Sequence, residues 1–199
     1  MPARLQGAAA MRALAHPTRI ALIEALRLHS TLTATEASAL IGESPTNCAF
    51  HLRALARFGF VEEVGGGRGR RRPWRALDVP LAFSDVQDDE QSTAAARALS
   101  DVLIRHWLER LQVAQAARHS EPAEWQEAFG GSQTVVHASV EEVREMVADI
   151  RAVLGRYDDR LMDAAARPEG SRPVEVLVFA QPYAPRTAAE VDTPPPPLA

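Results

Sequence analysis

The stretch TATEASALIGESPTNCAFHLRALARFG, residues 33–59, decides how the first part of this chain folds. Thr33 followed by Glu36 is a capping-box pattern, in which each side chain accepts a hydrogen bond from the other residue's backbone N–H. The helix that this pattern opens is only about two turns long by its spacing and stops at Gly42. Ser44 then caps a second helix. The stretch therefore predicts two helices joined by a tight turn.

The second predicted helix has two unlike faces. At about 100° per residue, Cys48, Leu52 and Leu55 fall together, and we expect this face to pack inward. The opposite face gathers Thr46, Asn47, Phe50, Arg53, Ala54 and Arg57. Polar side chains placed in this way can reach base edges in a DNA major groove, and an outward phenylalanine can touch a thymine methyl group. The predicted readers of the groove are Thr46, Asn47, Phe50 and Arg53.

The flanking segments extend the pattern on both sides. TRIALIEALRL, which follows Pro17, predicts a helix, and TLT at 31–33 has the β-branched character of an edge strand. FVEEV and WRAL predict a β-hairpin around the glycine-rich tip GGGRGRRRP. The arginines of this tip are Arg68, Arg70, Arg71 and Arg72. We expect them to lie along a DNA backbone or minor groove, and the alternative is a merely solvated hairpin tip.

LAHPTRIALIEAL followed by SPTNCAFHLRALARFGFVEE resembles the winged helix-turn-helix of ArsR-like bacterial transcriptional regulators. That family usually opens with Asp-Pro-Thr-Arg, where residues 16–19 here read HPTR. It has a His-Leu pair in the recognition helix, here at 51–52, and a Gly-x-Val entry to the wing, here at 59–61. The resemblance departs at Ala49 and Phe50, where many relatives carry serine and a polar or basic residue.

The resemblance implies a winged helix-turn-helix over roughly residues 12–78 and a homodimer that represses transcription from an inverted-repeat operator. The DNA-contacting residues expected on the recognition helix are then Ser44, Thr46, Asn47, Phe50, His51, Arg53 and Arg57. Relatives commonly dimerise through their first helix and a long helix after the wing. The matching helix here is predicted at 93–118, with Leu99, Val102, Leu103, Trp107 and Leu111 as interface residues.

Charge divides the chain into two parts. Residues 1–80 hold 11 arginines against 6 acidic residues, a net charge of +5. Residues 81–199 hold the remaining 11 arginines against 20 acidic residues, a net charge of −9, and the two parts sum to −4. The first part suits a polyanionic partner and the second does not.

The remaining segments complete a mainly α fold with small β elements. We expect an N-terminal arm at 1–11, an acidic connector at 79–92, a C-terminal α+β module at 93–181 and a disordered proline-rich tail at 182–199. Within the module, the predicted elements are a strand at 134–138, a helix at 140–161 opened by Ser139, and a strand at 174–180. The seam of the second helix, Val140, Val143, Val147, Ile150, Leu154, Tyr157 and Leu161, has coiled-coil spacing.

Two alternatives to a simple DNA-binding regulator stay open. A winged helix can pair with another protein through its recognition face, which an outward Phe50 would suit. The acidic module can also bind a small-molecule effector that gates the dimer. The aromatic residues that could line such a pocket, or simply pack, are Trp107, Trp125, Phe129 and Phe179.

Other classes have little support in the sequence. A single cysteine excludes an internal disulfide and fits a cytoplasmic protein, and no signal peptide or membrane span is predicted. Thiolate metal sensing needs neighbouring cysteines, and this chain has one. Cys48 and His51 stand three apart, a possible ligand spacing, but Cys48 is more simply a buried core residue, so we expect no metal and no cofactor. GGGRG lacks the Gly-Lys-Ser/Thr of a phosphate loop, and no catalytic constellation stands out, so we expect no enzyme.

Overall fold

The computed structural model describes residues 7–65, 72–77 and 85–184. Its chain divides into two compact units, Met1–His106 and Trp107–Ala199, each taken here by itself. The predominance of helix and the small amount of strand agree with the fold class predicted from the sequence. Among the described residues, no helix is both long and apolar enough to cross a bilayer.

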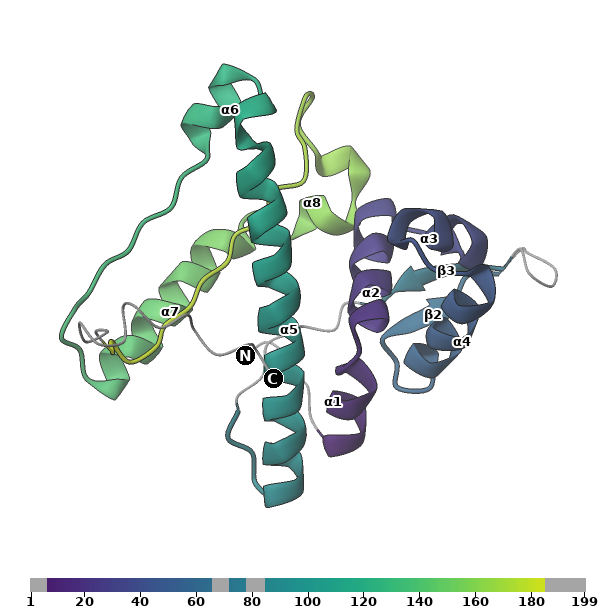
Figure 1. Ribbon diagram of the computed structural model, residues 1–199, viewed down its shortest axis with the longest axis horizontal. Coiled ribbons are helices and arrows are strands. Elements are labelled where there is room, and N and C mark those ends of the chain that lie inside the picture. The colour runs from purple at the N-terminus through teal and green to yellow at the C-terminus, as the bar shows by residue number, and fades with distance from the viewer. Residues whose placement is uncertain (1–6, 66–71, 78–84, 185–199) are drawn as a thin grey trace. The chain divides into compact units, whose positions relative to one another are not determined.

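The first unit contains the two helices and tight turn predicted by residues 33–59. In chain order its helices are α1 (Ala8–Leu14), α2 (Pro17–His29), α3 (Ala34–Ile41) and α4 (Pro45–Ala56), followed by the first part of α5 (Glu90–Ala117). Helix α2 packs against both α3 and α4, as Figure 1 shows. The three-residue connection between α3 and α4 leaves them little freedom of angle, so it sets the direction in which α4 presents its outer face.

A small antiparallel sheet completes the first unit. Its strands are β1 (Leu32–Thr33), β2 (Val61–Glu63) and β3 (Pro73–Ala76), in the order β1-β3-β2. Strand β1 lies at an edge, as its short β-branched sequence predicted. Strand β2 joins β3 as the predicted hairpin, with Val61 opposite Ala76 and Glu63 opposite Trp74. The sheet packs on α2 and α4, so the hairpin is held beside the outer face of α4.

The hydrophobic core of the described residues lies entirely in the first unit. Its largest fully buried side chains are Met11, Leu14, Ile20, Leu22, Leu26, Leu52, Leu55, Leu99 and Leu103. Burying a leucine or isoleucine side chain contributes on the order of 1.5–3 kcal/mol. His106 on α5 also contacts Glu24 on α2, with 2.8 Å between Nε2 and Oε2. The N-terminal half of α5 is therefore part of the same core as α2.

This core corrects the predicted dimer interface in part. Leu99 is 0% exposed and Leu103 is 1% exposed within a single chain, so both side chains are already covered by the first unit. Only Val102, Trp107 and Leu111 of the predicted set keep exposed surface for a second copy. The apolar stripe on two sides of α5 thus reflects its packing within the chain as well as any contact outside it.

The sequence predicted no helix where α1 lies: it placed residues 8–11 in an N-terminal arm and residues 12–14 at the start of the winged helix-turn-helix. The segment AAAMRAL has high helix propensity because alanine loses no side-chain entropy in a helix. Met11 and Leu14 are both fully buried, so packing adds to that propensity. A segment of seven residues is too short to show a periodic pattern, which is why the sequence alone did not reveal it.

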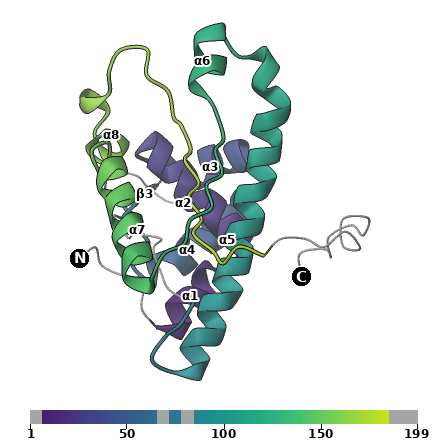
Figure 2. The same ribbon diagram turned by 90° about the vertical axis from the view of Figure 1, so that its left-hand side faces the viewer.

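The second unit consists of helices and irregular segments. It holds the rest of α5, α6 (Ala123–Ala128), α7 (Val140–Gly155), α8 (Asp159–Met162) and the 3₁₀ turns Arg118–Ser120 and Ala164–Ala166. Figure 2 shows α6 at the C-terminal end of α5. Ser139 caps α7 through the predicted capping box, but the helix ends at Gly155 rather than continuing to 161.

The two strands predicted in this unit are wrong. Residues 134–138 and 174–180 are described, and neither forms a strand: within the described ranges no ladder of backbone hydrogen bonds joins either segment to another. β-Propensity measures how well a side chain fits a pleated surface, so it cannot supply the missing neighbour. No side chain that the structure describes in the second unit is buried.

Candidate nucleic-acid interface

The N-terminus of α4 is built as its sequence predicts. The Ser44 hydroxyl accepts a hydrogen bond from the backbone N–H of Asn47 at 3.1 Å, and Pro45 occupies the first helical position. Gly42 ends α3 in the left-handed region, with φ of 74°, where other residues are strained. Thr33 and Glu36 form the predicted capping box of α3. Local rules of helix capping therefore fix both ends of the turn between the two helices.

The buried face of α4 is wider than the sequence predicted. Cys48, Leu52 and Leu55 are fully buried, as expected. Ala54, assigned to the outer face from its angle on the helix, is only 3% exposed. Helix α4 contacts α1, α2 and α3 as well as β2, so it is covered from more than one direction. The face left for a partner is correspondingly narrow.

The outer face carries three of the predicted groove-reading side chains. Thr46 and Arg53 are exposed, and Phe50 is 53% exposed. Arg57, also exposed, follows the last residue of the helix. Phe50 is thus a large apolar side chain held in solvent on a helix whose opposite side is in the core, which is the arrangement its position in the sequence predicted.

His51 does not lie where a DNA-contacting residue should. It is 5% exposed, and its Nδ1 accepts a hydrogen bond from Arg19 Nε at 3.3 Å. Its ring centroid lies 4.5 Å from that of His16, and the Phe50 ring meets it edge-on at 5.2 Å. Arg19 also donates to the carbonyl oxygen of Ala13 at 2.6 Å. His51 therefore joins α4 to α2 in this structure, which corrects its predicted place among the DNA contacts.

The two neighbouring histidines, whose rings are tilted by 44° to one another, share an electrostatic environment. Burial lowers the pKa of His51, and the neighbouring His16 and Arg19 lower it further, against an opposing effect of Glu43. Burial also lowers the pKa of His16, again with Arg19 acting in the same direction and Glu43 against it. Neutral rings are favoured at this junction, first because burial penalises the charged form and then because protonation would place positive charge beside a guanidinium.

Glu43 is a residue that sequence reasoning missed. Its carboxylate accepts hydrogen bonds from Asn47 Nδ2 at 2.9 Å and from Thr18 Oγ1 at 3.2 Å. The bond from Asn47 is the largest cause of a lowered pKa for this carboxyl group. Asn47, expected to read bases, therefore has its amide group engaged within the protein. No clear signal for this contact was present in the sequence, because Glu43 lies in the turn before the N-cap of α4 and not on the helix itself.

The wing is described only in part. Arg68, Arg70 and Arg71 lie outside the described residues, and Arg72 is exposed next to β3. Arg72 pairs with Glu63 across the hairpin at 3.0 Å, with both side chains at least 40% exposed. An ion pair this exposed contributes little to stability, so Arg72 can exchange its carboxylate for a phosphate at low cost.

A groove of about 330 Å³ lies between α3, α4 and the hairpin. Its lining residues are Ala34, Thr35, Pro45, Thr46, Ala49, Arg53, Glu63, Arg72 and Trp74. Arg53 on α4 and Arg72 beside β3 are its two cationic side chains, and Glu63 is its acidic one. The sequence predicted both arginines as DNA contacts on separate elements, and the fold brings them to one groove.

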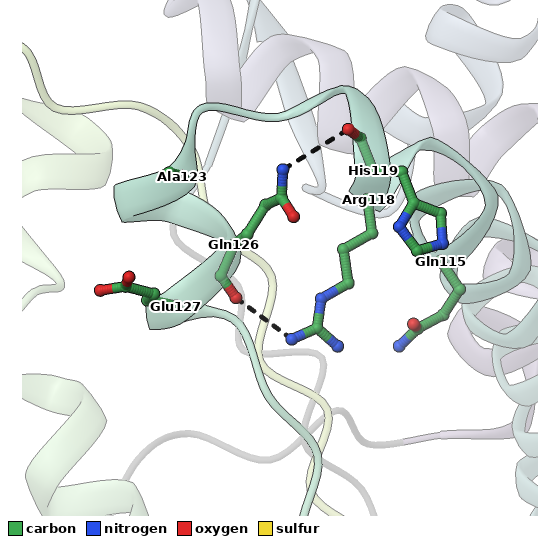
Figure 3. A pocket seen from close by; sticks show the side chains of 6 residues that line it. All are labelled: Gln115, Arg118, His119, Ala123, Gln126 and Glu127. Carbon is green, nitrogen blue, oxygen red and sulfur yellow. Dashed lines mark hydrogen bonds between the residues drawn. The ribbon is translucent and has the colours of Figure 1, made fainter.

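The second unit holds an open hollow of about 440 Å³ at the end of α5, shown in Figure 3. It is lined by Gln115, Arg118, His119, Ala123, Gln126 and Glu127. The Arg118 guanidinium donates to the carbonyl oxygens of Gln126 and Phe129, so it closes the loop around α6.

The aromatic residues expected to line an effector pocket do not line this hollow. Trp125 and Phe129 have ring centroids 5.6 Å apart, and Trp107 and Phe179 form a second pair at 6.2 Å. In the described part of the chain, no three His, Cys, Asp or Glu side chains gather where they could hold a metal ion.

Two capped helices joined by a tight turn, with an antiparallel hairpin beside the second helix, define a helix-turn-helix domain. Residues 14–64 match the family model for a helix-turn-helix domain, from the end of α1 through β2. This match supports a DNA-binding regulator. It covers about a quarter of the chain and none of the second unit. No curated protein matches the chain.

Proposed function

We propose that this chain is an ArsR-like transcriptional repressor that binds an inverted-repeat operator as a homodimer. The observation that carries the proposal is the outer face of α4, where Thr46, Phe50 and Arg53 are exposed on a helix capped and packed from behind. The helix-turn-helix match over residues 14–64 supports the DNA-binding part of this proposal. In a two-fold dimer the two α4 helices would enter successive major grooves, with half-sites about 10 base pairs apart.

Each exposed side chain has a role that its chemistry suits. Arg53 donates two parallel hydrogen bonds to guanine, and Phe50 contacts a thymine methyl group. Thr46 forms hydrogen bonds to bases or phosphates from the N-terminus of α4, where the helix dipole favours negative charge. Arg57 and the wing arginines Arg68, Arg70, Arg71 and Arg72 neutralise phosphates.

Three predicted contacts take other roles in this proposal. Ser44 orients α4 through its cap, and His51 holds α4 to α2. Asn47 reads a base only after its amide leaves Glu43, so its contact requires a rearrangement at the turn. Base reading by α4 in this state therefore falls mainly to Arg53 and Phe50.

The test is selective retention of DNA by the full chain. Sheared genomic DNA of the source organism is incubated with the protein at low salt, washed at rising salt, and the retained fragments are sequenced. We expect a few fragments to survive the washes, each containing an inverted repeat with half-sites one helical turn apart. Retention of all fragments alike at every salt concentration would contradict an operator-binding function.

A second candidate function rests on Phe50 itself. A phenylalanine 53% exposed at the centre of a helix face is also what a protein-binding surface presents. This alternative makes the domain an interaction module, and it predicts that no fragment is selectively retained in the same experiment.

A small molecule bound in the second unit is a further proposal on how the regulator is controlled. The open hollow beside α6 offers polar groups from Gln115, His119 and Glu127. A metabolite screen for a raised melting temperature tests it, and loss of the shift on replacing Gln115 and His119 with alanine would locate the ligand there.

A further inference from the structure

Residues 174–180, VEVLVFA, have the composition of a strand, and they pair with no strand that the structure describes. In the described part of the chain, none of their peptide groups has a backbone hydrogen-bond partner. Unpaired backbone N–H and C=O groups on a β-rich segment are a template for another strand. Pro173 and Pro182 bound the segment, so a ladder could run between them without meeting a residue that lacks an N–H.

One face of this segment is already supported by the second unit. Glu175 forms an ion pair with Arg110 on α5, and the Phe179 ring lies 6.2 Å from that of Trp107. Leu177, between them, is half-buried. Alternate residues of an extended segment point to opposite sides, so the odd-numbered side chains face α5. A two-stranded ribbon needs such a helix behind it to be stable.

The other face is apolar and uncovered. Val174, Val176 and Val178 are 54%, 56% and 45% exposed. On the same unit, Leu111 and Val113 of α5 are also exposed, at 40% and 71%. Leu111 belongs to the helix expected to dimerise, so the unpaired segment runs beside the surface where the proposed function already needs a second copy.

We propose that residues 174–180 pair antiparallel with the same residues of a second copy, about a two-fold axis at Leu177. In this register Leu177 faces Leu177, and a residue a given number of positions before Leu177 faces the residue the same number of positions after it in the other copy. Val176 then faces Val178 of the other copy, which is a favourable β-branched pair. Glu175 faces Phe179, so no like charges meet, and Pro173 faces Gln181. A two-fold axis makes the interface isologous, with one segment supplying both of its sides.

This inference deepens the proposed function, because it names the surface through which the expected homodimer forms. It rests on that function only in requiring two copies to meet, and its test needs no DNA. If the chain retains operator DNA but fails the crosslinking test below, only this inference is contradicted. If it passes the crosslinking test but retains no DNA selectively, only the proposed function is contradicted.

The experiment is disulfide crosslinking of full-length chains under mild oxidation. Leu177→Cys places two thiols on the two-fold axis, where facing Cα atoms are about 4.5–5.5 Å apart, within disulfide range. We expect most of this variant to run as a covalent dimer on a non-reducing gel. Val174→Cys is the matched control, since its two copies lie six residues out of register. The wild type, whose one thiol is the buried Cys48, shows whether disulfides form through Cys48 instead of the introduced cysteine.

A second pair of variants keeps the test decisive if Leu177→Cys does not fold. Val176→Cys and Val178→Cys change exposed side chains, and the register places each opposite the other. Co-expressed with tags of different mass, they should yield the mixed dimer several-fold faster than either yields its own. Failure of both designs to crosslink overturns the proposal. So does an intramolecular disulfide in the Val136→Cys, Leu177→Cys double variant, because that would pair the segment with residues 134–138 of its own chain.

Discussion

Phe50 carries the sharpest residue-level prediction, because it is the one large apolar side chain on the outer face of α4. If its ring covers a thymine methyl group, Phe50→Ala removes about 0.8 kcal/mol of discrimination, or a roughly four-fold preference for thymine at one position. The change should not alter the dependence of affinity on salt, since no phosphate contact is lost. Fluorescence anisotropy with operators carrying thymine or uracil, which lacks the methyl group, measures it. If the wild type bound the thymine and uracil operators with equal affinity, the proposed contact between Phe50 and the methyl group would be contradicted.

The histidine pair between α2 and α4 predicts loss of stability in mild acid. The pKa values of His16 and His51 are lowered in the folded chain, so the unfolded chain binds more protons once the pH approaches 6.5. Their contribution is therefore complete above pH 6.5 and declines as the pH falls below it. The lowered pKa of Glu43 acts in a separate window, because its stabilising effect is lost only as the pH falls below about 4.5.

Urea unfolding at pH 7.5 and 5.5 checks the histidine prediction. We expect the wild-type midpoint to fall between these two pH values, and the fall to be smaller in the His16→Gln, His51→Gln double variant. Arg19 and Glu43 face the pair, and the lowered pKa of the Glu43 carboxyl keeps that group ionised throughout this range. An equal fall in both proteins would show that other groups are responsible.

At the scale of single elements, the cap of α4 predicts a measurable loss of stability. Ser44→Ala leaves the Asn47 N–H without its hydrogen bond, at a cost of about 1 kcal/mol. In a background that keeps Trp74 as its only tryptophan, the fluorescence of this residue, buried in the first unit, follows the unfolding. Ser139→Ala, which removes the matching cap of α7 in the second unit, serves as the control. It should leave the Trp74 transition unchanged, and an equal effect of both variants would mean that the two units unfold together.

The hairpin tip predicts a change in salt dependence. The logarithm of the DNA affinity falls by roughly 0.9 per phosphate contact for each log unit of salt. Arg71→Ala with Arg72→Ala should therefore reduce the slope by up to about 1.8 and weaken all sequences alike. The matched control is Arg144→Ala with Arg151→Ala, two exposed arginines of α7. If the dependence of affinity on salt were the same as in the wild type, the wing would not contact DNA.

The elements differ in how well the sequence predicted them, for physical reasons. The turn between α3 and α4 was predicted correctly because Thr33, Glu36, Gly42 and Ser44 act on backbone groups within four residues of themselves. The burial of His51 and Ala54 was missed because it depends on the helices and strand that close over α4 from several directions. The strand at 174–180 was predicted from composition and did not form, because strands need a partner that composition does not contain.

For the molecule as a whole, the uneven distribution of core predicts two unfolding transitions. The first unit holds every buried side chain that the structure describes, and the second holds none. In dilute solution we expect the second unit to lose structure at lower urea than the first. Variants that keep a single tryptophan, Trp74 or Trp125, report each unit separately. Raising the protein concentration should move only the Trp125 transition, because dimerisation would stabilise the unit that pairs. Coincident transitions at all concentrations would contradict this division.

The reactivity of Cys48 measures how often α4 opens away from the core. The chain has one thiol, Cys48, which lies completely buried on the inner face of α4. Burial raises its pKa, so it is protected from reagents that attack thiolates. Modification must then wait until α4 lifts from its neighbours. The labelling rate of the wild-type thiol therefore measures how often the helix detaches. We expect bound operator DNA to lower this rate in proportion to the fraction of protein that is bound. The native thiol thus reports local opening of α4 without any engineered probe.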